Sequence, residues 1–84
     1  MLARAVQSLG RGSIVSYAVI IEPSDSNFGA WVPDLPGCVA VGDALEEVQR
    51  EIREAIEFHI ESLRMHNEPV PPPVSRAAMV PVSD

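Results

Sequence analysis

FGAWVPDLPGCVAVGD, residues 28–43, is the stretch that decides the fold. Two short apolar runs, 28–32 and 38–41, flank a corner made of Pro33, Asp34, Leu35, Pro36 and Gly37. This pattern predicts two strands joined by a stiff turn, because each proline fixes φ at about −65° and a glycine accepts the positive φ that a sharp reversal often needs. Gly42 and Asp43 then end the second strand and begin a helix.

A further strand is predicted upstream of this stretch. Residues 14–22 are rich in Val, Ile and Tyr, and their alternation places Tyr17, Val19 and Ile21 on one face, with the other face also mostly apolar. The turn-forming segment PSDSN, 23–27, should join this strand to the next as an antiparallel hairpin. We expect residues 1–13 to be a flexible N-terminal arm, followed by a single domain over 14–84.

Downstream of Asp43 the apolar period changes to that of an amphipathic helix packed on a sheet. The apolar positions that share one side are Leu45, Val48, Ile52, Ala55, Ile56, His59, Ile60 and Leu63. Asp43 and Glu46 have the form of a capping box, and Asn67 is the expected left-handed residue at the other end. The helix should therefore run from near Asp43 to near His66, about 35 Å, across the whole sheet.

Beyond the helix, EPVPPP at 68–73 predicts an extended, polyproline-like connector. Residues 75–82 return to an apolar run, which Pro81 restricts to the edge of a sheet. The predicted fold is α+β, with the order β-β-β-α-β. It is a small, mostly antiparallel sheet with one long helix packed on one face.

Composition limits the classes of function. Six arginines, no lysine and twelve acidic residues give a net charge of −6, which opposes direct binding to nucleic acid. The single Cys38 forms no internal disulfide and suits a reducing compartment, so we expect a cytoplasmic protein, and no stretch is apolar enough to span a membrane. In a chain of 84 residues without other staples, we expect a dimer or tetramer.

Candidate chemical groups favour structural roles. Glu22, Asp34 and Asp43 invite comparison with the converging carboxylates of metal-dependent nucleases, but turn and capping duties already explain two of the three. Cys38 has no evident base nearby. We therefore predict no catalytic residue, no metal ligand and no cofactor.

The chain resembles the N-terminal domain of HicB-family antitoxins over residues 15–82. The resemblance rests on the corner motif from Pro33 to Cys38, followed by Gly42, Asp43 and the helix start, and on PVP at 69–71. It implies a partial RNase H-like fold and a function of binding and blocking a small, basic, RNA-cleaving HicA toxin. Family members often carry a second, DNA-binding domain, which we do not expect this chain to supply.

Contact residues are predicted from composition. Glu22 and Asp25 should pair with cations of the toxin, with Phe28 or Trp31 as an apolar anchor, because one helix covers only one face of the sheet. Phe58 and Met65, which sit off the apolar side of the helix, are candidate oligomer contacts. The alternatives are an interaction module without a toxin partner and a metal-dependent RNase H-like nuclease.

Overall fold

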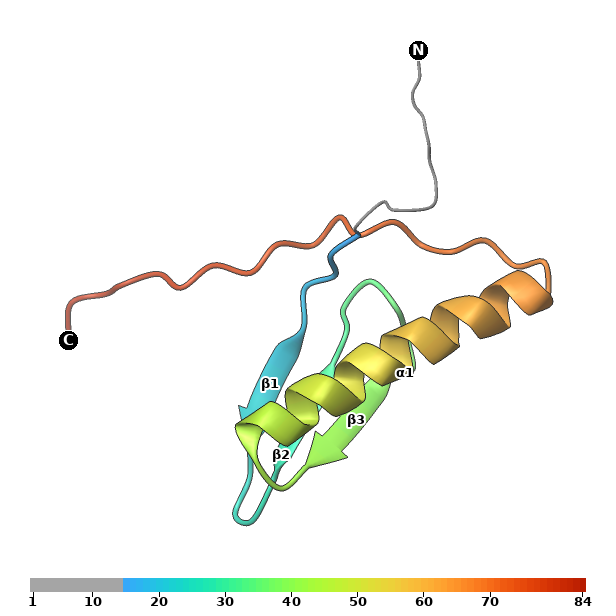
Figure 1. Cartoon of the computed structure of the whole chain (residues 1–84). Helices are drawn as coiled ribbons and strands as arrows, with labels where there is room; N and C mark the ends of the chain where they lie inside the picture. Colours follow the sequence, from blue (N-terminus) through green and yellow to red (C-terminus); the bar gives the residue numbers. More distant parts are fainter. Residues whose placement is uncertain (1–14) are drawn as a thin grey trace.

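The computed structural model describes residues 15–84 as three antiparallel strands followed by one long helix (Figure 1). The elements are β1 (Ile20–Pro23), β2 (Phe28–Trp31), β3 (Val39–Gly42) and α1 (Leu45–Met65). The strands lie in the order β1-β2-β3, and α1 crosses one face of the sheet. The predicted α+β class and β-β-β-α order are confirmed. The expected arm at residues 1–13 lies outside the described residues.

The predicted hairpin forms, but its first strand is shorter than expected. Ile20 pairs with Trp31 and Pro23 with Phe28, and the amide of Ser24 closes the turn on the carbonyl of Asn27 at 2.8 Å. Residues 15–19, predicted as the beginning of this strand, are extended but unpaired. The reason is that β2 ends at Trp31, where the corner begins, so no strand runs beside them.

The corner has the predicted rigid form. The amide of Leu35 donates to the carbonyl of Val32 at 3.1 Å, and the amide of Cys38 donates to the carbonyl of Leu35 at 3.1 Å. Gly37 has a φ of 85°, in the left-handed region that glycine enters without steric strain. The turn also drives Leu35 into the interior, where it is fully buried.

The core lies between the sheet and the helix. Its buried members are Ala30, Val32, Leu35, Cys38, Val48 and Ile52. The helix packs on β3 and β2 and leaves the β1 side of the same face open. Gly42 permits the close approach, because a Cβ there would lie 2.7 Å from the backbone nitrogen of Val48.

The helix ends correct one prediction and confirm another. Ala44, and not Asp43, is the N-cap residue, and no side chain caps the helix there; Oε1 of Glu47 accepts the amide of Asp43 at 2.9 Å. The predicted capping box of Asp43 and Glu46 therefore does not form. Asn67 has a φ of 56°, as predicted, and the amide of Glu68 donates to the carbonyl of Leu63 at 2.9 Å, which completes a Schellman motif.

The predicted last strand, 75–82, does not form. Residues 68–84 are extended and pair with no strand of the described chain. The segment returns past the corner, where the Tyr17 hydroxyl donates to the carbonyl of Pro71 at 2.6 Å and Asp34 holds Val74 and Ser75. Beyond Ser75 it leaves the body of the molecule (Figure 1), so no strand edge lies alongside it and no ladder can form.

Candidate protein-binding surfaces

The face of the sheet opposite the helix is apolar and uncovered within the described residues. We call it the open face, and it comprises Ile20, Glu22, Gly29, Trp31, Val39 and Val41. Pairing aligns Ile20, Trp31 and Val39 in one row across the three strands. The exposed fractions are 41% for Trp31, 63% for Val39 and 61% for Val41. A contiguous apolar patch of this kind on a small protein is typical of an interaction site.

The structure brings two of the four predicted partner-binding residues onto one surface. Glu22 and Trp31 lie on the open face, in neighbouring rows. Asp25 lies in the exposed turn between β1 and β2. Phe28 lies on the other face, where it is half-buried and packs against the core. The open face therefore has Trp31 as its aromatic anchor. Val39 and Val41 of β3 were not predicted as part of this surface, because the sequence of a short apolar strand does not tell whether its side chains are buried or exposed.

Phe58 and Met65, the predicted oligomer contacts, lie on the side of α1 away from the core. They are 72% and 75% exposed. Their spacing of seven residues places them about two turns apart on one side of the helix. Their exposure agrees with the sequence pattern, and their role as contacts stays a prediction.

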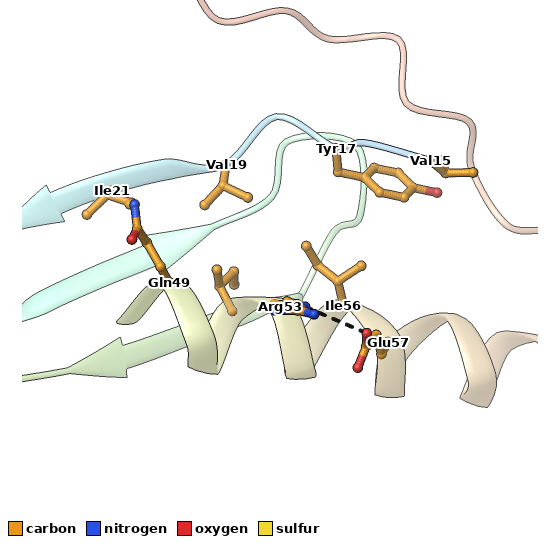
Figure 2. Close-up of a pocket in the computed structure, with 9 residues that line it drawn as sticks. Val15, Tyr17, Val19, Ile21, Gln49, Arg53, Ile56 and Glu57 are labelled. Carbon is orange, nitrogen blue, oxygen red and sulfur yellow. Dashed lines mark ion pairs between the residues drawn. The ribbon is translucent and has the colours of Figure 1, made fainter. Parts of the chain in front are cut away.

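A groove lies between α1 and the segment that leads into β1 (Figure 2). Its volume is about 730 Å³, and its apolar wall includes Val15, Tyr17, Val19, Ile21, Ile52 and Ile56. Figure 2 shows Val19 pointing toward the helix and Ile56 pointing toward Tyr17. The groove exists because α1 packs over β2 and β3 but not over β1. The alternation in 14–22 predicted that Tyr17, Val19 and Ile21 share one face. Only the tertiary structure shows that α1 does not pack over them.

Asp34 has a larger role than the turn assigned to it from sequence. Its Oδ2 accepts the amides of Val74 at 2.9 Å and Ser75 at 2.8 Å, and its Oδ1 accepts the Ser75 hydroxyl at 2.7 Å. These donors, with the Ser75 amide first, lower the pKa of Asp34, because they favour the charged carboxylate. Burial, and then the charge of Asp34, raise the pKa of Tyr17. We call the hydrogen bonds of Asp34 to Val74 and Ser75 the Asp34 clamp. We call the hydrogen bond from the Tyr17 hydroxyl to the carbonyl of Pro71 the Tyr17 contact.

The remaining motif residues serve the fold. Cys38 is buried, and desolvation raises the pKa of its thiol, so it lacks the thiolate character of a nucleophile. In residues 15–84 no group of three or more His, Cys, Asp or Glu side chains is placed to hold a metal ion. Glu22, Asp34 and Asp43 thus do not converge, and within this part of the chain no helix is long and apolar enough to cross a bilayer.

Comparison with known proteins identifies the family. Residues 17–82 match the family described as the HicB-like antitoxin of bacterial toxin-antitoxin systems. The chain belongs to this family. The HicB-like resemblance read from the corner motif is therefore confirmed, and an antitoxin family implies a toxin partner in general.

Relatives of this HicB-like chain include small stand-alone proteins. A UPF0150 protein of Synechocystis sp. is 44% identical over 59 residues, which are 69% of this chain and 75% of that protein. A UPF0150 protein of Thermoplasma acidophilum is 43% identical over 58 residues, 68% of this chain and 84% of that protein. An uncharacterized 14.9 kDa protein of Haemophilus phage HP1 is 40% identical over 55 residues, 66% of this chain but only 41% of the phage protein. This chain therefore spans less than half of that relative, and no solved structure gives a significant match.

Proposed function

We propose that this HicB-like chain is an antitoxin that binds a small, basic, RNA-cleaving toxin of the HicA type in the cytoplasm and neutralises it without catalysis. The open face is the observation that carries the proposal. It presents Trp31, Val39 and Val41 with exposed fractions of 41%, 63% and 61% on a rigid antiparallel sheet. Binding energy in protein interfaces concentrates in such aromatic anchors with an apolar surround.

The charge of the chain favours a basic partner. The net charge is −6, and Glu22 and Asp25 are exposed at the β1 end of the open face. Opposite charge on a toxin would raise the rate of association and align the two surfaces. The same negative charge opposes direct binding of this chain to nucleic acid.

The proposed mechanism is steric. A surface that binds RNA is basic, because it must neutralise phosphates. An acidic, apolar-centred face that covers this surface competes with RNA for it, so the toxin is blocked without any chemical step by the antitoxin. The anchor would be Trp31, with Glu22 pairing with a toxin cation at the rim.

The experiment co-expresses this chain with a small basic protein encoded beside it and measures growth and co-purification. Wild-type chain should bind the toxin and restore growth. Val41→Asp places a charge in the open face and Trp31→Ala removes the anchor, so each should weaken binding by about 100-fold or more.

The matched control is Phe58→Glu, which adds a charge at another exposed apolar residue, on the outer side of α1. It should leave toxin binding within about threefold of wild type, as expected for a position outside the interface. Failure of wild-type chain to bind or neutralise the neighbouring protein would contradict the proposed function. Equal binding by wild type and Val41→Asp would contradict the choice of the open face.

A further inference from the structure

Two apolar features of the chain are uncovered and lie at different places. One is the groove between β1 and α1. The other is the C-terminal tail, residues 76–82, in which every residue is exposed. Met79 is 97% exposed, Val80 72% and Val82 82%. An isolated extended apolar segment gains nothing from exposure, because burial of each such side chain is favourable.

The base of the tail is fixed, and it points away from its own groove. The Asp34 clamp holds Val74 and Ser75, and the Tyr17 contact holds Pro71, at the end of the sheet where the corner lies. Figure 1 shows that the tail continues outward from this point and leaves the sheet behind. The sequence of the tail has the apolar pattern of an edge strand, yet its own sheet gives it no partner.

The free edge beside the groove has the length to accept such a strand. In the described chain β1 pairs only with β2, so its other edge has free amide and carbonyl groups. The extended edge from Val15 to Pro23 would measure about 30 Å, and the seven residues of the tail would measure about 23 Å. A strand added to this edge would extend the sheet under the uncovered side of α1, where the groove lies.

Pro81 limits how the tail can pair. Proline has no amide hydrogen, so its backbone must face away from the neighbouring strand. Backbone groups alternate sides along a strand, so Ala78, Val80 and Val82 are the residues that would face β1 with their amides. Their side chains share one face, and all three are apolar.

We propose that residues 76–82 of one copy of this chain add to the free edge of β1 in a second copy and fill its groove. The exchange is reciprocal, as expected for a two-fold dimer, so each dimer closes two grooves and buries two tails. The groove of each copy is complete only with residues of the other. The open face takes no part in this contact and stays free for a partner of another kind.

The first test measures the dissociation constant of self-association by sedimentation velocity over a range of concentrations. Val80→Asp alters the tail and Val15→Asp alters the groove, at residues that are 72% and 60% exposed in the single chain. Each should raise the dissociation constant by about 100-fold or more, because an unpaired charge would enter an apolar contact. The matched control is Val41→Asp on the open face, which should self-associate like wild type.

The second test mixes the two variants. Val80→Asp has an intact groove and Val15→Asp has an intact tail, so the mixed pair can form one sound contact of the two. The mixture should form a one-to-one dimer at concentrations where each variant alone is a monomer. This complementation distinguishes exchange from general loss of folding, and circular dichroism of each variant should match wild type.

Three outcomes would overturn the proposal. If the wild-type chain is a monomer and its tail amides are protected from hydrogen exchange, the tail pairs within its own chain and not with a second copy. Loss of self-association in Val41→Asp alone would move the contact to the open face. Failure of the mixed variants to form a dimer would exclude reciprocal exchange. None of these outcomes depends on a toxin, so this proposal and the proposed function can fail separately.

Discussion

The two faces of the sheet differ far more in what covers them than in what they are made of. Val32, the residue directly after β2, and Val41 of β3 are the same residue type, yet Val32 is 2% exposed and Val41 is 61% exposed. The face with Val32 has α1 and the corner over it, and the face with Val41 has nothing over it in the described chain. Apolar residues on a strand thus mark a surface to be covered, and only the rest of the chain tells whether the cover is internal.

The largest expected effect comes from placing the same charge on each face. Val32→Asp should unfold the domain, because a buried carboxylate without a partner costs several kcal/mol, which is about the whole free energy of unfolding of a small domain. Val41→Asp should leave the free energy of unfolding within about 0.5 kcal/mol of wild type. Urea titration followed by circular dichroism measures both. A folded Val32→Asp variant of unchanged stability would contradict the role given to Val32 in the core.

The glycines of the sheet sharpen the comparison. Gly42→Ala places a Cβ on the helix side at 2.7 Å from the backbone nitrogen and 2.9 Å from the Cα of Val48, neither of which can rotate away. It should destabilise the domain by about 1–3 kcal/mol, as overpacking does.

Gly29→Ala is the matched change on the open face, where a new Cβ meets nothing within 4 Å. It should stay within about 0.5 kcal/mol of wild type. Thermal unfolding of both variants checks the pair. Equal effects at the two positions would show that loss of backbone freedom, and not helix contact, decides the outcome.

The smallest effect concerns the end of the sheet, where the Asp34 clamp binds Val74 and Ser75 of the C-terminal segment. The pKa of Asp34 is lowered in the folded chain, so the clamp is fully formed above the ordinary aspartate pKa and is lost as pH falls through the lowered value, below about 4. The amide proton shifts of Val74 and Ser75 should titrate in this range. Global unfolding should not accompany the change.

Asp34→Ala gives the control for this titration. The two amide signals should then take at neutral pH the positions that wild type reaches in acid, and they should no longer respond to pH in this range. Signals that still titrate in Asp34→Ala would assign the transition to another carboxylate.

The sequence was informative where local chemistry decides the structure. The corner, the hairpin turn and the bounds of α1 followed from proline, glycine and the apolar period, and the left-handed Asn67 was predicted by position alone. Each of these features depends on a few neighbouring residues. Exposure of Trp31 also followed, since one helix cannot cover two faces.

Features that depend on distant residues were not predicted. The Asp34 clamp joins residues about forty positions apart, and nothing near Asp34 indicates its partner Ser75. One local feature was also wrong, because the N-cap is Ala44, and Glu47, not Glu46, accepts the amide of Asp43. The pattern at 75–82 predicts a strand, but beyond Ser75 the segment runs away from the sheet and does not reach the free edge of β1 in its own chain.

The prolines between the helix and the tail have a consequence for assembly. Of residues 69–73, only Val70 has a backbone amide hydrogen, so this strap cannot join a sheet and stays extended at about 3.1 Å per residue. These five residues therefore span a nearly constant distance of about 15 Å, with little slack, within the connection between the end of α1 and the Asp34 clamp. Because the start of the tail is fixed in this way, residues 76–82 cannot shift by two residues along β1 of the second copy. The stiffness of the strap therefore selects a single pairing register between the two copies.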